Sequence, residues 1–412
     1  MIYDSLEFEI HYTNKDSDYI KDVINGLEDK YREIMNFFGI RHFKKKLIIN
    51  IWDSCDKYRE YYNKKMKPYN KEVGDWEVGR SIYNKDEFRI DVIGVEEARK
   101  CKGHDNYSLD NFIKVIIHEF VHSCHFQYRG NNDVITWIAE ALATNLSNQY
   151  DNLPIYLDVS FDDIMNKQVN YCNYYAMGNY LLNACSCEYV LKLAKDDEFL
   201  KKESRKVYDD TLLYLERVRL NDYDKVSNPL ELLNYMNRYI RYGIKDDNGN
   251  IYKWEMDDFI DACFTKWKFR DGLGVIKSGF GHCFDQTEIE RDWFSKKGYE
   301  IKTLFIVFQI DRGNPYICHT YLVYKDNNKW NWFEHADNNN RGIHSFSSLE
   351  EAVLCQKKKH IEFNRSLGLP INDDIINTIH VYEYEAPEYG CSNQEFLDNL
   401  FDNGKEIVIK KR

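Results

Sequence analysis

The sequence lacks any hydrophobic run long enough to cross a membrane, since no stretch approaches the about 18 apolar residues that a spanning helix needs. Residues 1–8 contain no basic region followed by an apolar stretch, so we expect no signal peptide. No internal repeat or low-complexity tract is visible, and proline is scarce, at 6 of 412 residues. These absences predict a soluble protein that resides in the cytoplasm and has no membrane partner.

An excess of positive charge is also missing. The net charge is -12, whereas nucleic acids and anionic membranes bind basic surfaces. The 11 cysteines are scattered and lack the dense spacing of a disulfide scaffold, which fits a reducing compartment. Hydrophobic residues make up 43% and charged residues 30%, the balance of a globular chain. The composition therefore excludes a nucleic-acid partner and leaves the oligomeric state open.

The chain is too long for one ordinary core, so two domains are expected. A polar, charged stretch from Asp196 to Asp224 separates two regions of different character, and Asn228-Pro229 then opens a helix that Gly243 closes. We place the boundary near residue 225, which gives domains 1–224 and 225–412.

Hydrophobic periodicity predicts an α+β fold in both regions. In the first region we expect a buried strand and a half-exposed strand before two long helices. In the second we expect a helix, stopped by Gly298, and then three strands. The expected ranges are strands 46–52 and 88–93, helices 110–128 and 134–149, helix 284–297, and strands 301–310, 317–324 and 330–334.

A metal-binding pattern stands in the first long helix. Residues 116–122 read Ile-Ile-His-Glu-Phe-Val-His, an HExxH motif. Because residues i and i+4 share a helical face, His118 and His122 can present two imidazoles to one zinc ion. Glu119 is rotated toward the position of a metal-bound water and can take its proton as the general base.

The third ligand is expected from the next helix. Glu140 lies 18 positions after His122 (140 minus 122), in the segment Trp137-Ile138-Ala139-Glu140-Ala141-Leu142-Ala143. A carboxylate there completes three protein ligands and leaves a fourth position for water, as in catalytic zinc sites.

The two segments together resemble the gluzincin branch of the zinc metallopeptidases, over roughly residues 45 to 195. The resemblance implies a zincin fold, Zn²⁺ as the cofactor and hydrolysis of a peptide or protein substrate. It also implies that strand 88–93 corresponds to the family's edge strand, which aligns peptides. Ala141 departs from the pattern, because many relatives have Gly there.

Two further residues near the motif need a role. His125 shares the face of His118 and His122, but one more helical turn places it poorly for the same ion, so we expect it in the second shell or on the surface. The segment 173–180 resembles the family's helix with Tyr-x-x-Gly, which implies that the hydroxyl of Tyr175 donates to the oxyanion. The alternative for Tyr175 is an ordinary core position, since the chain has 32 Tyr.

The second region contains a cysteine flanked by glycines at a helix start, in Gly279-Phe280-Gly281-His282-Cys283. A helix dipole and free amides there stabilise a thiolate. His319 follows in a strand, and Glu334 ends the next strand. In that order Cys283, His319 and Glu334 can serve as nucleophile, base and orienting acid. We expect the strand face of His319, Tyr321 and Val323 to meet the cysteine helix.

This second pattern resembles the transglutaminase-like superfamily of papain-type cysteine enzymes, over about residues 228 to 350. The acid of that family is usually Asp, whereas this chain offers Glu334 at the matching place and Asp337 three residues later, so the acid stays open. The family also includes non-catalytic binding modules.

The sequence thus predicts a zincin domain followed by a transglutaminase-like domain. The leading function is zinc-dependent peptide hydrolysis. The alternatives are a cysteine protease, amidase or transferase acting through Cys283, or a C-terminal domain that binds a partner without catalysis.

Overall fold

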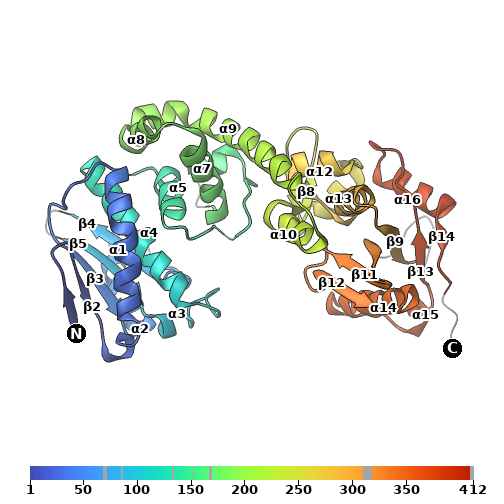
Figure 1. Ribbon diagram of the computed structural model, residues 1–412, viewed down its shortest axis with the longest axis horizontal. Helices are drawn as coiled ribbons and strands as arrows, with labels where there is room; N and C mark the ends of the chain where they lie inside the picture. Colours follow the sequence, from blue (N-terminus) through green and yellow to red (C-terminus); the bar gives the residue numbers. More distant parts are fainter. Residues whose placement is uncertain are drawn as a thin grey trace. The chain divides into compact units, whose positions relative to one another are not determined.

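The computed structural model describes residues 1–67, 72–84, 87–131, 134–151, 153–166, 169–309 and 318–408. The fold is α+β, as expected (Figure 1). The chain forms two compact units, Met1–Tyr214 and Leu215–Arg412. The expected boundary between residues 224 and 225 lies ten residues after the observed division between Tyr214 and Leu215. The difference arises because the polar stretch forms one long helix, α9 (Asp197–Tyr223), which continues past that division.

Unit 1 is built on a five-stranded sheet with the order β1-β2-β3-β5-β4. β2, β3 and β5 run parallel, and the outer strands β1 and β4 pair antiparallel with their neighbours. The strands are β1 (Ile2–Asp4), β2 (Phe8–His11), β3 (Leu47–Trp52), β4 (Gly79–Tyr83) and β5 (Phe88–Ile93).

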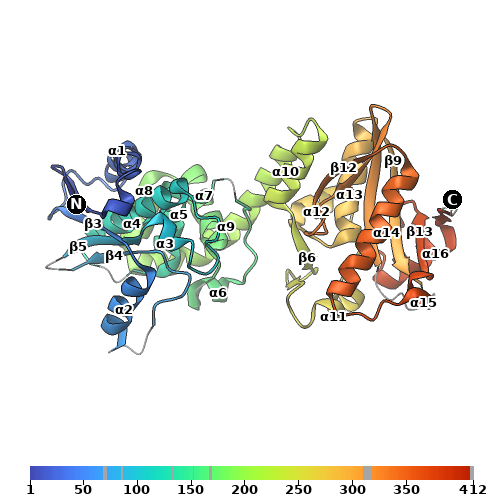
Figure 2. The same ribbon diagram turned by 90° about the horizontal axis from the view of Figure 1, so that it is seen from below.

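Helices cover both faces of this sheet, and Figure 2 shows α1 and α2 on opposite sides of it. On the α2 side, the hydroxyl of Tyr62 donates to Asp91 of β5. The helices of unit 1 before α9 are α1 (Ile20–Phe37), α2 (Cys55–Met66), α3 (Val95–Ala98), α4 (Leu109–Arg129), α5 (Thr136–Leu146), α6 (Phe161–Asn166), α7 (Tyr171–Ala184) and α8 (Cys187–Lys195), with a short 3-10 turn at Asn14–Asp16.

The identity of the edge strand differs from the prediction. Phe88–Ile93 is indeed a strand, β5, but it lies between β3 and β4 and is mostly buried. The edge is β4, whose residues are all half-buried and therefore show no alternation that a sequence pattern could reveal. Gly79 allows α4 to approach this edge closely, because a Cβ there would lie 2.9 Å from Val115 Cγ1 and 3.5 Å from Glu119 Cγ.

Unit 2 contains a six-stranded antiparallel sheet with the order β12-β11-β10-β9-β13-β14, and a small sheet with the order β7-β6-β8. The expected antiparallel pairing of the strands that begin near residues 301 and 317 is confirmed. The link 311–314 between them, with Ile310 and Ile317, lies outside the described residues. The strands are β6 (Arg241–Lys245), β7 (Ile251–Lys253), β8 (Phe280–Gly281), β9 (Glu300–Phe308), β10 (Cys318–Asp326), β11 (Lys329–Glu334), β12 (Gly342–Phe346), β13 (Ile379–Glu383) and β14 (Lys405–Glu406).

Helices of unit 2 begin and end largely at the residues that the sequence signals. Asn228 caps α10, but this helix ends at Tyr239, and Gly243 lies in β6 instead of closing it. α13 begins at Cys283, and Gly298 follows its end with φ 79°. The helices are α10 (Pro229–Tyr239), α11 (Phe259–Thr265), α12 (Gly272–Ser278), α13 (Cys283–Lys296), α14 (Leu349–Ser366), α15 (Asp373–Ile376) and α16 (Asn393–Asn403).

The two faces of the large sheet pack into separate clusters. Phe305 and Val307 pack in a cluster with Phe284 of α13. Tyr321 and Val323 pack in another, with Val353 of α14. The expectation that the face of Tyr321 and Val323 meets the cysteine helix is therefore wrong, since strand periodicity tells which residues share a face but not which helix covers it.

Packing of α5 against α7 provides a first test of the fold. A Cβ at Gly178 would overlap the carbonyl oxygen of Ala141 and the amide of Asn145. Replacing Gly by Ala inside a helix normally stabilises it by about 1 kcal/mol, but here we expect Gly178→Ala to destabilise unit 1 by about 1–3 kcal/mol.

The measurement is thermal and urea unfolding of the full chain, with the exposed Asn183→Ala in the same helix as the control. A Gly178→Ala variant as stable as the wild type would show that α5 and α7 do not pack this closely.

Candidate functional site

Helix α4 places two imidazoles side by side. A capping box of Ser108 and Asn111 starts the helix, and Gly130 with φ 87° ends it. His118 and His122 are both buried, and their Nε2 atoms lie 3.1 Å apart. The i, i+4 spacing therefore brings the two nitrogens to one point, as the motif predicts.

Helix α5 adds the carboxylate. Glu140 Oε2 lies 3.3 Å from His118 Nε2, and its Oε1 lies 3.6 Å from His122 Nε2. The ligand atoms of the three residues lie within 4.8 Å of one another. Within the described part of the chain, no other three His, Cys, Asp or Glu residues gather this closely.

Within the cluster, the carboxylates and the imidazoles each stabilise the charged form of the other. Burial disfavours the charged form of both partners, but the Glu140 and Glu119 carboxylates raise the pKa of His122 above its usual value. The two histidines in turn hold the pKa of Glu140 well below its usual range, against the effect of burial. Glu140 thus stays ionised, the state in which a carboxylate binds a cation.

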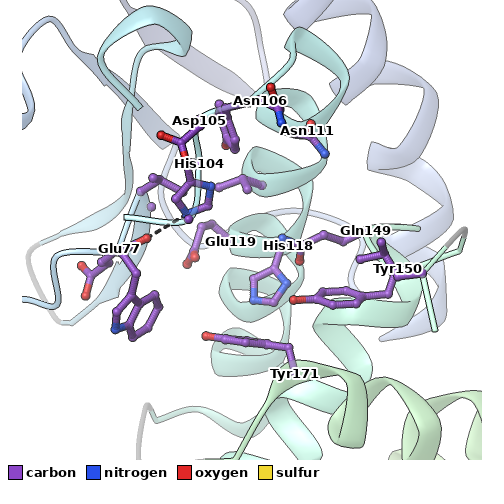
Figure 3. Close-up of a pocket in the computed structure, with 17 residues that line it drawn as sticks. Glu77, His104, Asp105, Asn106, Asn111, His118, Glu119, Gln149, Tyr150 and Tyr171 are labelled. Atoms are coloured by element: carbon purple, nitrogen blue, oxygen red, sulfur yellow. Dashed lines mark hydrogen bonds between the residues drawn. The ribbon is translucent and has the colours of Figure 1, made fainter. Parts of the chain in front are cut away.

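Glu119 lies beside the cluster and faces open space. It lines a pocket of about 480 Å³ together with His118, Tyr107, Tyr150 and Tyr171. Figure 3 shows His118, Glu119 and the phenols of Tyr150 and Tyr171 turned toward this pocket. A water or substrate in the pocket can therefore reach the Glu119 carboxylate and the imidazole of His118 together.

A second pocket, of about 280 Å³, connects the cluster with the edge strand. Arg80 and Ser81 of β4 line it together with His122 and Glu140. Among the described strands β4 pairs only with β5. Its outer backbone edge thus adjoins the candidate metal ligands.

The tyrosine that lines both pockets is not the one that the sequence pattern indicates. Tyr171, at the start of α7, lines both pockets, and its ring lies 6.0 Å from that of His118. Burial raises its pKa, as do the carboxylates of Glu140 and Glu119, so its phenol keeps its proton. Tyr175, one turn later, lines neither pocket, and its hydroxyl donates to Asp151 at 3.4 Å.

His125 lies neither in the second shell nor on the surface. It is fully buried, and its Nε2 lies 2.8 Å from the carbonyl oxygen of Ala194. Burial lowers the pKa of His125 to about 4. The neutral ring therefore joins α4 to the end of α8 and takes no part in the cluster.

The second constellation also comes together, within unit 2. His282 caps α13, which places Cys283 in the first turn of that helix. His319 Nε2 lies 2.9 Å from Glu334 Oε2. Burial lowers the pKa of His319, but Glu334 and a hydrogen bond with the Cys283 thiol raise it well above its usual value.

Sheet topology explains how His319 reaches the thiol although Tyr321 and Val323 pack on the other face. β11 ends at Glu334, one residue after Phe333, which pairs with Leu322 of β10. His319 therefore lies beyond the paired part of β10 and β11. Its imidazole lies beside the end of β11, where it contacts Glu334 and lies near enough to Cys283 for the thiol to raise its pKa.

The carboxylate that contacts His319 is that of Glu334. Its Oε2 accepts a hydrogen bond from Trp332 Nε1 at 3.3 Å in addition to the His319 contact, and its Oε1 accepts one from the backbone N–H of Asp337 at 2.8 Å. The Asp337 carboxylate accepts hydrogen bonds from Asn339 and Asn340 instead.

Two more side chains belong to this site, and sequence patterns did not single them out. Tyr242 of β6 lies near Cys283, and burial, followed by the charge of Cys283, raises the pKa of its phenol well above the usual value. Glu290 of α13 is buried, and burial together with Glu334 raises the pKa of its carboxyl. Neither lies in a motif, so only the tertiary fold reveals them.

A comparison with protein-family models, with curated proteins and with solved structures finds no match to this chain. No helix in the described ranges combines the length and the hydropathy needed to cross a membrane. The residues themselves therefore carry the functional argument.

The raised pKa of His319 predicts the pH dependence of thiol reactivity. The raised pKa means that His319 loses its proton at a higher pH than a free histidine, and a positive charge beside a thiol favours the thiolate. We expect iodoacetamide to modify Cys283 at similar rates at pH 6 and pH 8. The reaction of an ordinary exposed thiol slows about 10²-fold when the pH falls from 8 to 6.

Mass spectrometry of peptides from the alkylated chain measures both rates, with the exposed Cys187 as the internal reference. Glu334→Gln should slow Cys283 at pH 6, because it removes the carboxylate that keeps His319 charged. If Cys283 slows in parallel with Cys187, the thiolate–imidazolium pair does not exist.

Proposed function

We propose that the chain is a zinc-dependent peptide hydrolase of the gluzincin type. The observation that supports this most is the convergence of His118, His122 and Glu140. Glu140 Oε2 is buried without a hydrogen bond although it lies 3.3 Å from His118 Nε2, and Oε1 lies 3.6 Å from His122 Nε2. Two imidazoles and one carboxylate form a donor set that fits Zn²⁺ and leaves a position for water.

Each group of the site would have its own role in hydrolysis. A bound zinc ion, held by His118, His122 and Glu140, would supply Lewis-acid polarisation of the scissile carbonyl. Glu119 takes the proton of the attacking water and delivers it to the leaving amine. Tyr171 keeps its phenol proton and donates a hydrogen bond to the oxygen on which negative charge develops.

The edge strand β4 supports a peptide as the substrate. An extended peptide can add to a free sheet edge through main-chain hydrogen bonds. Such pairing would carry the peptide past Arg80 and Ser81 toward the ligand cluster, with side chains entering the pocket of about 480 Å³. Main-chain pairing is tolerant of sequence, so selectivity has to come from the pocket.

Removing the general base tests the proposal. Glu119→Gln should keep one zinc per chain but lower kcat for peptide cleavage about 10²–10⁴-fold, because an amide cannot accept the proton. His122→Ala should lose the metal as well. Elemental analysis and cleavage of a peptide library measure the two effects.

The control is the exposed Glu96→Gln on α3, which makes the same chemical change away from the cluster. Stoichiometric zinc in His122→Ala would overturn the ligand assignment. Wild-type turnover in Glu119→Gln would overturn the mechanism.

The two tyrosines of α7 form a matched pair for a second test. Tyr171→Phe should lower kcat about 10²-fold with little change in KM, because the lost hydrogen bond strengthens in the transition state. Tyr175→Phe removes the same hydroxyl one turn away and should leave kcat within about twofold of the wild-type value. A hydroxyl that does not contact the reacting atoms, or contacts substrate and transition state equally, does not change turnover.

Steady-state kinetics of both variants decide between the residues. Loss of turnover in Tyr175→Phe alone would restore the role that the sequence pattern indicates. If both variants turn over as fast as the wild type, neither tyrosine donates a hydrogen bond to the oxyanion.

We propose a second candidate function, thiol-dependent acyl transfer at Cys283, because of the 2.9 Å contact between His319 and Glu334. This agrees with the resemblance of unit 2 to transglutaminase-like proteins. The thiolate would attack an amide carbon, and the C–N bond would break as the imidazolium protonates the leaving amine. Water or another amine would then release the acyl group. A non-catalytic binding role of unit 2 is the alternative.

A further inference from the structure

An apolar surface near Cys283 remains exposed. Trp254 is 50% exposed, Met256 39%, Ile260 57% and Phe264 56%. We call these four residues the α11 patch, because they lie on α11 and the turn before it. They are concentrated in 11 consecutive residues, and exposed groups of large apolar side chains on a soluble protein mark interaction sites.

The residues of the patch do not pack α11 onto the core of unit 2, because another face of α11 is buried there. Phe259 and Ala262 point inward and are almost fully buried, whereas Ile260 and Phe264 lie one turn apart on the outer face. Residues at i and i+4 make a continuous stripe on a helix. A short helix with two apolar faces is suited to bind a second partner on its outer face.

Acidic side chains outnumber basic ones around the patch. Residues 254–261 include four exposed carboxylates, whereas the lysines that flank the patch in sequence are Lys253 and Lys266. Asp246, Asp258 and Asp261 all contribute to raising the pKa of Tyr252, after a larger effect of burial, so they lie close together. A partner that matches this surface carries apolar side chains with Lys or Arg beside them. The same charges oppose binding to an anionic lipid surface.

The inner face of α11 leads directly to the thiol. Phe259 and Ala262 pack in the same cluster as Cys283. The ring centroid of Tyr242 lies 6.4 Å from that of Trp254 and 6.0 Å from that of Phe259, and Cys283 contributes to the raised pKa of the Tyr242 phenol, after burial. Figure 2 shows β6, which carries Tyr242, next to α11. A polypeptide on the patch would lie about one helix diameter, about 10 Å, from the thiol.

We infer that the α11 patch binds a cationic, amphipathic polypeptide segment of the protein on which Cys283 acts. This inference rests on the thiol-dependent function proposed above. The apolar stripe would provide the affinity, and the acidic rim would select segments with Lys or Arg.

Fluorescence anisotropy with labelled model peptides tests the inference on the full chain. One probe is a 14-residue helical peptide of Leu and Lys, and its matched counterpart contains Leu and Glu. We expect the Leu/Lys peptide to bind, and added salt to weaken it. The Ile260→Ser/Phe264→Ser variant should bind at least about tenfold more weakly, because two contacts of an interface core are lost. Asp258→Lys/Asp261→Lys should bind about tenfold more weakly and lose the salt dependence.

Matched controls and a second readout complete the design. Leu354→Ser/Leu367→Ser removes two leucines, 48% and 44% exposed, elsewhere in unit 2 and should bind like the wild type. Bound Leu/Lys peptide should slow iodoacetamide modification of Cys283 at least fivefold in the wild type and not in Ile260→Ser/Phe264→Ser.

Four results would overturn the inference. The first two are unchanged peptide affinity in the patch variants and equal binding of the Leu/Glu and Leu/Lys peptides. The third is a dimer, seen in sedimentation, that Ile260→Ser/Phe264→Ser abolishes. The fourth is a large fall in the melting temperature of Ile260→Ser/Phe264→Ser. The last two would mean that a second copy or this same chain covers the patch. If the peptide binds as expected but Cys283 reacts as an ordinary thiol, the thiol function fails and the binding surface stands.

Discussion

The approach of His118, His122 and Glu140 within 4.8 Å is the constraint around which unit 1 is arranged. Burying polar groups without full hydrogen bonding destabilises a fold, and here Nδ1 of both histidines and one oxygen of Glu140 have no hydrogen-bond partner. The surrounding packing holds these groups together. α5 is fixed against α7 by Asn145, which donates to carbonyl oxygens of both helices. A bound cation would offset the cost of this burial.

Features that depend on local chemistry could be predicted from the sequence. The limits of α4 follow from Ser108 and Gly130, and those of α13 follow from the glycines around Cys283 and Gly298. The pairing of His118 with His122 needs only helical geometry. Glu140 could be placed because its position after the motif matches a known spacing. In each case a few neighbouring residues decide the structure.

Features that depend on packing could not be predicted in this way. β4 has no alternating pattern, because its half-buried residues lie between α4 on one side and solvent along its edge. Tyr171 and Tyr175 lie one turn apart on one helix, and only the orientation of α7 against α5 decides which of them lines the pockets. For Tyr321 and Val323, periodicity gave the shared face but not the helix that covers it.

Burial distinguishes the two carboxyls of the second site, one of which no sequence pattern singled out. Two carboxyls, Glu290 and Glu334, lie near His319 in a region of low dielectric, where two negative charges would repel strongly. The oxygens of Glu334 have partners in His319, Trp332 and a backbone N–H, whereas one oxygen of Glu290 has none. Burial and the charge of Glu334 raise the pKa of Glu290, which favours the neutral form of Glu290. A neutral Glu290 adds no negative charge beside the buried contact of His319 with Glu334.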